Sequence, residues 1–344
     1  MQKQLLLGVE AIAQGAIDSG ISGVYAYPGT PSTEITEYIQ NSKEAIARNV
    51  HRAWAANEKT AMESALGMSY AGKRALVCMK HVGMNVAADC FMNAAITGAN
   101  GGLVVTAADD PSMHSSQNEQ DSRVYGKFAF VPVLEPSNQQ EAYDMVQAAF
   151  DFSEKYRIPV LMRLTTRMAH SRAVVEVAGV RAENECSYPA QTRQWVLMPG
   201  NSRVRYNTLL DDDARFETEA AESRFNRYTD APDKSVGIIA CGIAHNYLTE
   251  NYPDGCPHPV LKISQYPLPA SLVRRMASEC GSLLIIEEGQ PVVEQAVRGI
   301  LPAPLDIRGR MTGQLPRTGE LTPDSVRAAL GLAPHATHAA SQIV

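Results

Sequence analysis

Short apolar runs that alternate with segments of helical periodicity constrain this chain more than any other feature. The runs at 23–27, 74–79, 102–107 and 159–165 have the length and composition of buried strands. Just before the last of them, Gln139–Tyr156 carries apolar residues at helical spacing. Strands and helices alternate in this way in parallel, doubly wound sheets. We therefore predict an α/β fold, with a first domain at residues 1–178.

The same pattern returns later in the chain and predicts a second, smaller α/β domain. Apolar runs at 235–241, 259–263 and 282–287 suit strands, with helical segments between and after them. The residues between the two domains are rich in charge and keep no strand pattern, so we expect a packed linker arm with one charged helix. The predicted units are a linker at 179–232, a second doubly wound domain at 233–310 and a tail at 311–344.

Charge and cysteine usage narrow the classes of function. The net charge of the 344 residues is -6, which argues against a general nucleic-acid binder. No apolar run approaches the roughly 18 residues of a membrane span. None of the six cysteines forms a CxxC pair, so neither a disulfide framework nor an iron–sulfur cluster is expected in this chain. We expect a cytoplasmic protein, and we interpret Met1–Gly20 as a mature helix rather than a signal peptide.

Polar residues follow two of the predicted strands, and a carboxylate begins the helix before them. Glu58 starts an Ala-, Met- and Gly-rich helix, and Lys80 and His81 follow the strand at 74–79. The strand at 102–107 leads into a polar segment that contains Asp109, Asp110, His114, Gln117 and Asn118. Open α/β sheets bind ligands at the carboxyl ends of their strands. These side chains are therefore candidates for one ligand site.

Each candidate also has a purely structural explanation. Asn57 and Glu58 both suit the capping of a helix N-terminus. Lys80 beside His81 is also compatible with a surface charge next to a packed histidine. The segment around His114 is also compatible with a solvated loop.

A further strand end carries the sequence Tyr27-Pro-Gly-Thr-Pro-Ser-Thr-Glu34. Thr30 suits an N-cap and Pro31 suits the first position of a helix. A helix N-terminus at the end of a strand can bind an anion, because its free N–H groups and its dipole face the ligand. The alternative is a plain turn between strand and helix.

Several long stretches resemble one enzyme family. NEKTAMESALGMSYAGKRALVCMKHVGMNVAAD, VTAADDPSMHSSQNEQDSR, LEPSNQQEAYD and YPGTPSTEI are similar to the α subunits of indolepyruvate:ferredoxin oxidoreductases. GIIACGIAHNYL and LKISQYPLP extend the resemblance into the second predicted domain. The similarity is collinear from about Leu6 to Leu321 and is weakest over Arg181–Asp233.

The resemblance implies a thiamine diphosphate (TPP) enzyme assembled from several parts. It makes the first domain the pyrimidine-binding (Pyr) domain and the second a transketolase-C-terminal-like domain. Members of the family continue into a diphosphate-binding domain with a GDG signature and a cysteine-rich ferredoxin-like domain, and neither motif is present here. The resemblance therefore implies that partner subunits hold the TPP diphosphate, Mg²⁺ and 4Fe–4S clusters, with a γ-type subunit among them.

The resemblance also assigns roles to residues. Glu58 would donate a hydrogen bond to N1′ of the TPP aminopyrimidine, a contact that activates the cofactor. A carboxyl group among Ala, Met and Gly loses hydration, which favours its protonated, donating form. The remaining assignments are cofactor contacts at Gly29, Met84 and Asn85, substrate contacts at Thr30, Lys80, His81, His114, Gln117 and Asn118, and no metal ligand in this chain.

The activity implied is the oxidative decarboxylation of a 2-oxoacid to its acyl-CoA, with electrons passed to ferredoxin or a similar carrier. The pyruvate branch has an arginine where this chain has Asp109-Asp110, which suggests a different substrate, of the arylpyruvate or indolepyruvate type. Two alternatives stay open. One is a non-redox TPP-dependent decarboxylase or lyase subunit, and the other is a non-catalytic scaffold subunit.

Overall fold

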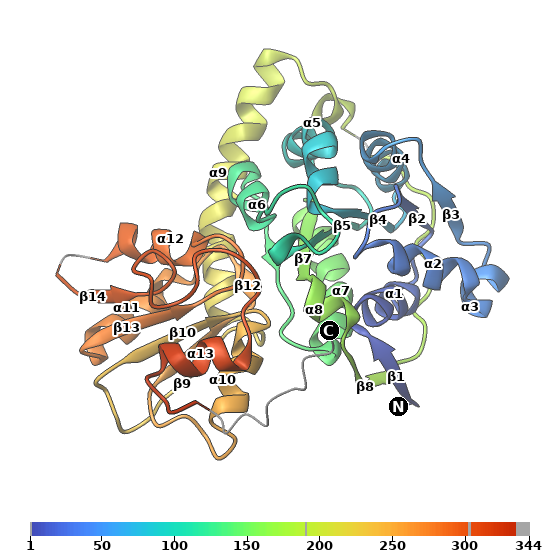
Figure 1. Ribbon diagram of the computed structural model, residues 1–344. Coiled ribbons are helices and arrows are strands. Elements are labelled where there is room, and N and C mark those ends of the chain that lie inside the picture. Colours follow the sequence, from blue (N-terminus) through green and yellow to red (C-terminus); the bar gives the residue numbers. More distant parts are fainter. Residues whose placement is uncertain (1, 190, 302–303, 335–344) are drawn as a thin grey trace.

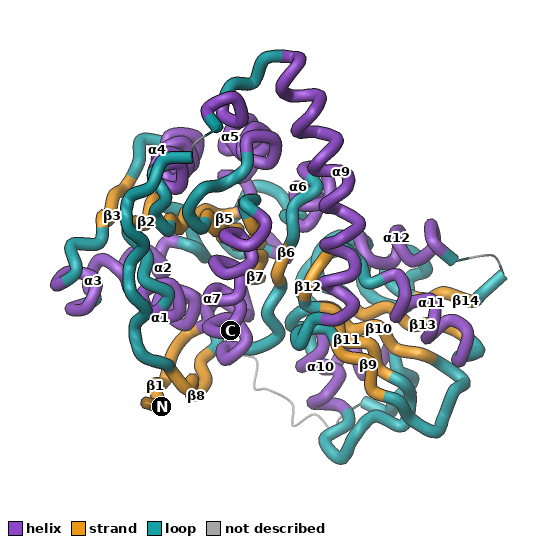
Figure 2. The backbone as a smooth tube through the Cα atoms, turned by 180° about the vertical axis from the view of Figure 1, so that it is seen from behind, coloured by secondary structure: helices purple, strands orange, loops and turns teal. Residues whose placement is uncertain are grey.

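The computed structural model describes residues 2–189, 191–301 and 304–334. Two lobes are visible, each built around a sheet with helices on both sides (Figure 1). The long helix α9 (Pro199–Glu222) runs along the junction between the lobes (Figures 1 and 2). In the described part of the chain, no helix combines the length and apolar character needed to cross a bilayer.

The elements follow the predicted alternation. The first lobe contains, in chain order, β1 (Gln2–Leu7), α1 (Gly8–Asp18), β2 (Gly23–Ala26), α2 (Thr33–Asn41), α3 (Lys43–Ala47), β3 (His51–Trp54), α4 (Glu58–Tyr70), β4 (Ala75–Lys80), α5 (His81–Thr97), β5 (Leu103–Asp109), η1 (Pro111–Met113), α6 (Arg123–Ala129), β6 (Val133–Leu134), α7 (Gln139–Tyr156), β7 (Val160–Thr165), α8 (Thr166–His170) and β8 (Arg172–Val177). After η2 (Thr192–Trp195) and α9 come β9 (Arg227–Thr229), β10 (Gly237–Cys241), α10 (Ala244–Asn251), β11 (Val260–Ile263), β12 (Gln265–Tyr266), α11 (Ala270–Glu279), β13 (Ser282–Ile286), α12 (Val292–Ile300), β14 (Asp306–Arg308) and α13 (Pro323–Ala329).

A seven-stranded sheet organises the first lobe, in the order β12-β6-β7-β5-β4-β2-β3. Its strands are parallel except for β12, which pairs antiparallel with β6. Successive side chains of a strand point to opposite faces, so Leu76 and Cys78 pack into one apolar cluster with α1 and α7. Val77 and Met79 pack into a second cluster with α4 and α5. Both faces of the sheet are therefore covered, as predicted for a doubly wound fold.

The second lobe repeats the architecture on a five-stranded sheet, in the order β14-β13-β10-β11-β9. Strands β10, β11, β13 and β14 are parallel, and β9 is the antiparallel edge. The short strand β12 lies between β11 and α11 in the chain, yet it joins the sheet of the first lobe. The two lobes are therefore tied together by backbone hydrogen bonds as well as by side chains.

Buried charges also join the lobes. We call Asp109, Asp121, Arg123, Glu135, Arg163 and Glu287 the interdomain ion cluster; each is at most 5% exposed. Arg163 contacts Asp109 at 2.7 Å and also pairs with Glu135, both from the first lobe. Arg123 contacts Asp121 at 2.6 Å and Glu287 of the second lobe at 3.0 Å. Glu287 and the Glu288 carbonyl, which accepts a hydrogen bond from Arg163, thus lie at an interface inside this chain.

The electrostatics of the cluster follow from burial and pairing. Burial raises the pKa of Asp109 and of Glu287, although the nearby arginines oppose the shift. At Asp121 burial acts in the same direction, but Arg123 and Arg163 outweigh it and hold the pKa below its usual range. Asp121 also accepts a hydrogen bond from the Gln290 N–H at 2.9 Å. The cluster is a network in which each carboxylate has a cationic partner.

Two predicted helix starts are wrong. Gln2–Leu7 is a strand rather than part of a helix, because it pairs antiparallel with β8 along its whole length. Thr30 and Pro31 are not the N-cap and first residue of a helix, since α2 begins at Thr33 after Ser32. There the Gly29 N–H donates to Thr33 Oγ1 at 2.8 Å, and the Ser32 hydroxyl donates to the Gly29 carbonyl at 2.7 Å. These bonds close a turn that delays the helix.

Helix α5 begins at His81 directly after β4, with Lys80 as its N-cap residue. Lys80 and His81 therefore occupy the boundary between strand and helix. The two residues thus lie on regular secondary structure and not on a loop.

Candidate active site

Glu58 is the first residue of α4, and the residue is 8% exposed. The capping of the helix falls to Asn57, whose side chain accepts a hydrogen bond from the Thr60 N–H at 2.9 Å. Within the described residues, no hydrogen bond to the Glu58 carboxyl group is found, and its oxygens are not among the fully buried atoms. The carboxyl group at this helix N-terminus is therefore available to a ligand, while Asn57 caps the helix.

The glycine of the next helix makes room for this carboxyl group. A Cβ atom on Gly83 would lie 2.7 Å from Glu58 Oε1 and Cγ, which is closer than real contacts allow. Gly83 lies in the first turn of α5, and α5 packs against α4. The first turns of both helices thus meet at Glu58, where two sets of backbone N–H groups favour a polar or anionic ligand.

Lys80 and His81 connect the end of β4 to the polar segment after β5. The Lys80 ammonium donates to the Ser115 carbonyl at 3.0 Å. His81 is fully buried, and its Nε2 lies 3.1 Å from the Asn118 carbonyl oxygen. Because a carbonyl only accepts, Nε2 carries the proton, and the buried Nδ1 has no partner among the described residues. His81 therefore fixes the polar segment and keeps one ring nitrogen unused.

Thr30 and Gly29 lie beside the same strand end. Strand β2 pairs with β4 so that Ala26 is opposite Cys78, which places the segment after β2 next to Lys80. A Cβ on Gly29 would be 3.0 Å from Lys80 Cδ, and the Ser115 hydroxyl donates to the Thr30 carbonyl at 3.3 Å. The structure thus brings Gly29, Thr30 and Lys80 together.

Asp110 holds the polar segment in shape. Its carboxylate accepts hydrogen bonds from the Ser115 N–H at 2.8 Å, the Ser116 hydroxyl at 2.6 Å and the Thr166 hydroxyl at 2.9 Å. Burial would raise the pKa of Asp110, but these donors outweigh it and lower that pKa to about 2. Asp109, its neighbour, turns into the interdomain ion cluster instead. The two adjacent aspartates are both structural, which sequence spacing alone did not reveal.

The other predicted residues are less tightly grouped. Asn85 is exposed and accepts a hydrogen bond from the Tyr125 hydroxyl, whereas Met84 is buried in the apolar cluster. His114 lies 3.4 Å from Glu320 of the C-terminal segment, and its side chain is 53% exposed. Gln117 is exposed on the same segment as Asn118. The structure joins Asn118 to His81 through its backbone and leaves the Gln117 side chain facing outward.

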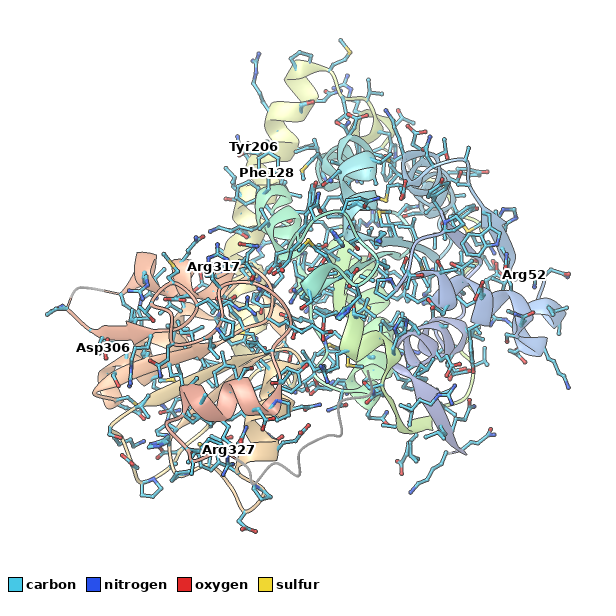
Figure 3. The ribbon with its side chains drawn as sticks, viewed as in Figure 1. Arg52, Phe128, Tyr206, Asp306, Arg317 and Arg327 are labelled. Carbon is cyan, nitrogen blue, oxygen red and sulfur yellow. The ribbon has the colours of Figure 1, made fainter. Side chains whose placement is uncertain are left out.

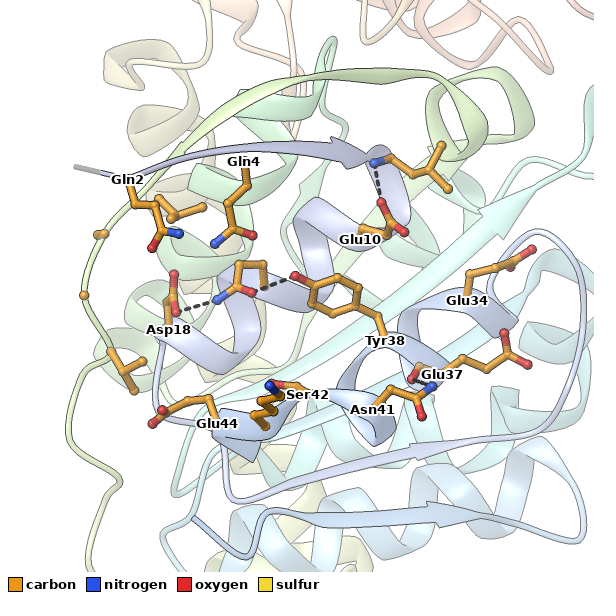
Figure 4. Close-up of a pocket in the computed structure, with 17 residues that line it drawn as sticks. Gln2, Gln4, Glu10, Asp18, Glu34, Glu37, Tyr38, Asn41, Ser42 and Glu44 are labelled. Atoms are coloured by element: carbon orange, nitrogen blue, oxygen red, sulfur yellow. Dashed lines mark hydrogen bonds between the residues drawn. The ribbon is translucent and has the colours of Figure 1, made fainter. Parts of the chain in front are cut away.

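A large cavity elsewhere is separate from these residues. It has a volume of about 970 Å³ and lies between β1, α1, α2 and the residues after β8 (Figure 4). Acidic side chains dominate its wall, among them Glu10, Asp18, Glu34 and Glu37. None of the predicted site residues lines it. The candidate active site is instead the region around Glu58 at the carboxyl ends of the strands of the first sheet.

Sequence reasoning missed Gly83 and Tyr125, and it named Asp110 as a ligand-site candidate without its structural role. Nothing in the sequence showed that the missing side chain of Gly83 accommodates Glu58. The role of Asp110 depends on hydroxyl groups from two segments, and the partnership of Tyr125 with Asn85 joins two helices. The run of serines after Asp110 was the one available signal.

Comparisons with known proteins agree with this picture. Residues 14–227, more than half of the chain, match the family described as pyruvate flavodoxin/ferredoxin oxidoreductase, thiamine diP-bdg. The chain is 42% identical over 344 residues to the indolepyruvate oxidoreductase subunit IorA of Archaeoglobus fulgidus, covering 97% of this chain and 55% of that protein. The chain thus spans about half the length of the curated relatives it matches.

Solved structures share the fold. A 2-oxoglutarate:ferredoxin oxidoreductase from Magnetococcus marinus superposes with a TM-score of 0.74 at 14% identity, covering 96% of this chain and 65% of that one. A split-gene transketolase described as an inactive beta4 tetramer superposes with a TM-score of 0.59 at 17% identity, covering 95% of this chain and 97% of that one. At such low identity these two structures establish the two-domain α/β fold and nothing further.

Proposed function

Because the chain belongs to the pyruvate flavodoxin/ferredoxin oxidoreductase, thiamine-diphosphate-binding family, we propose that it supplies the pyrimidine-binding half of a TPP-dependent 2-oxoacid oxidoreductase. One observation carries the proposal. Glu58 is 8% exposed and lies at a helix N-terminus beside a glycine, and its carboxyl group has no hydrogen-bond partner among the described residues. Its carboxyl oxygens are not among the fully buried atoms, so a ligand can reach them.

The residues present fit the aminopyrimidine of TPP. The Glu58 carboxyl group would hydrogen-bond to a ring nitrogen of the aminopyrimidine, while Gly83 keeps the space beside it clear. When bound, TPP supplies the carbanion that attacks the 2-oxo group. Gly29 and Asn85 would contact the cofactor from the neighbouring strand end and from α5, and Met84 would support the ring from the core side. No described group of His, Cys, Asp and Glu residues in this chain could hold a metal ion.

The residues proposed to bind the substrate lie at the carboxyl ends of β2 and β4. Thr30 and Lys80 lie together there and would bind the carboxylate of a 2-oxoacid, with Lys80 supplying the charge. His81 would orient the polar segment through Asn118, and His114 and Gln117 would line its outer side. The relatives named for indolepyruvate suggest an aryl side chain on the substrate.

The remaining functions would come from polypeptide outside this sequence. We assign the site for the TPP diphosphate and Mg²⁺ to a partner subunit. A γ-type subunit would also take part, and 4Fe–4S clusters in a partner subunit would carry electrons towards ferredoxin. CoA would accept the acyl group. The six cysteines are all free thiols, which suits a reducing cytoplasmic setting.

The direct test is the Glu58→Gln variant in the assembled enzyme. The amide keeps the size of the side chain but loses the carboxylic proton, so we expect turnover to fall by at least about 100-fold, in line with losses of single general-acid contacts. The matched control is Glu63→Gln, on the same helix with a side chain that is 52% exposed, which should leave turnover within about twofold. Turnover of E58Q within a few-fold of wild type would refute the assigned role.

A further inference from the structure

A second, smaller cavity lies between the two lobes, away from Glu58. Its volume is about 260 Å³. The first lobe contributes the N-terminus of α7 with Glu141, and the second contributes His245 on α10 and Lys262 on β11. Arg224 and Arg227, at the end of the linker, complete the wall. The wall therefore holds two arginines, one lysine and one carboxylate.

The one carboxylate in this wall is already engaged. Glu141 pairs with Lys262, which is 7% exposed, and accepts hydrogen bonds from the Ser137 N–H at 3.0 Å and hydroxyl at 2.7 Å. Burial would raise the pKa of Glu141, but Lys262 and Ser137 outweigh it and keep the pKa below its usual range. Glu141 thus offsets the charge of Lys262, and no ion pair joins it to either arginine.

The two arginines have no such partner. Among the described residues, neither Arg224 nor Arg227 forms an ion pair with a carboxylate. Arg227 lies opposite Lys262 in the pairing of β9 with β11, so the two cations line the same wall. The wall carries a net charge of +2 once Glu141 is counted against Lys262.

The pKa of His245 reflects this excess of positive charge. Its pKa is lowered to about 4, first by burial and then by Lys262 and Arg227, while Glu141 acts in the opposite sense. The imidazole is therefore neutral at pH 7 and can accept or donate a hydrogen bond. The N-terminus of α7, an 18-residue helix, points its positive dipole end at the same space.

We propose that this cavity binds a phosphate group, either as free phosphate or as part of a phosphate ester. The two unpaired guanidinium forks match the several oxygens of a tetrahedral dianion, and a single carboxylate would leave part of these donors unpaired. The cavity has room for the phosphate and the first atoms attached to it. Because both lobes contribute to its wall, the bound phosphate bridges them.

The test measures binding to the full chain by calorimetry and ³¹P NMR, with inorganic phosphate and glycerol 3-phosphate as probes. The variant is R224Q/R227Q, and the control is R203Q/R274Q, which removes two exposed arginines that have no ion pair among the described residues. We expect the double variant to bind phosphate about tenfold more weakly or worse, which corresponds to about 1.4 kcal/mol, and the control to bind like wild type. Tighter binding of the ester would identify an organic phosphate, and tighter binding of inorganic phosphate the free ion.

His245 provides a readout that a merely structural role would not move. Bound phosphate should raise the pKa of His245, because the dianion offsets Lys262 and Arg227, and ¹H NMR of the imidazole would detect it. The absence of phosphate binding to wild type, equal binding by R224Q/R227Q, or equal affinity for malonate would each overturn the proposal. None of these outcomes bears on the role of Glu58.

Discussion

Two clusters of polar side chains lie at the carboxyl ends of the first sheet, and they are satisfied to different degrees. In the interdomain ion cluster, Arg163 touches Asp109 and Glu135, and Arg123 touches Asp121 and Glu287. At the candidate active site, the buried Nδ1 of His81 has no hydrogen-bond partner among the described residues, and the Glu58 carboxyl group, whose oxygens are not fully buried, has none either. Glu58 and His81 are at most 8% exposed, so burial of the residue alone does not separate the two clusters.

The difference teaches how to distinguish structural from functional charge in this fold. A buried ion network with complete pairing fixes the geometry of the two lobes. Removing one partner costs more stability than the intact network contributes, because the remaining charge stays buried without a counter-charge. A buried group without a partner keeps its desolvation cost until a ligand arrives. Substitutions in the first cluster should therefore change stability, and those in the second should change activity.

The largest effect should come from Arg163→Met. This change leaves Asp109 and Glu135 buried without their cation, and we expect a loss of about 3–5 kcal/mol in the free energy of unfolding, measured with denaturant. Arg167→Met is the matched control. Arg167 is 41% exposed and pairs with Glu320, so its loss should be below about 1 kcal/mol. Equal stability of the two variants would break the distinction between the clusters.

A smaller effect on stability, but a clear one on activity, should follow Gly83→Ala. Alanine favours the helix by about 1 kcal/mol, while its Cβ would displace the flexible Glu58 side chain, which lies 2.7 Å from that position. We expect a nearly unchanged melting temperature and a turnover reduced by at least about tenfold, because a positioned proton donor contributes more than that.

Gly67→Ala is the control for this change. Gly67 lies on α4 with no atom within 4 Å of the added Cβ, so the variant should be as stable as wild type or slightly more so, and fully active. Wild-type turnover in G83A would show that the position of Glu58 does not matter for the reaction.

The fold was largely predictable, because it depends on patterns that are local in sequence. Helix α7 was predicted at its observed bounds, and β4, β5 and β7 each fall within one or two residues of the predicted runs. The missed elements depend on distant pairing. Gln2–Leu7 is a strand because β8 lies beside it, and Gln265–Tyr266 joins the first sheet through β6. Neither partner can be recognised from the segment itself.

The site was predictable in its parts but not in its arrangement. The position of Glu58 at the start of a helix, and of Lys80 and His81 at a strand end, follows from the pattern. That Asp109 turns inwards to Arg163 while Asp110 holds the adjacent loop depends on which way each side chain points. Phe128, 71% exposed, and Tyr206, 43% exposed, show apolar area that this chain leaves uncovered (Figure 3).

The most direct measurement is the structure of the assembled complex with TPP bound. The distance to determine is that from the nearer Glu58 carboxyl oxygen to N1′ of the aminopyrimidine. We predict a hydrogen bond of about 2.6–3.0 Å, with Gly83 still packed against the Glu58 side chain. A Glu58 side chain turned back to its own helix, or TPP bound out of its reach, would contradict the assignment of this carboxyl group to the cofactor.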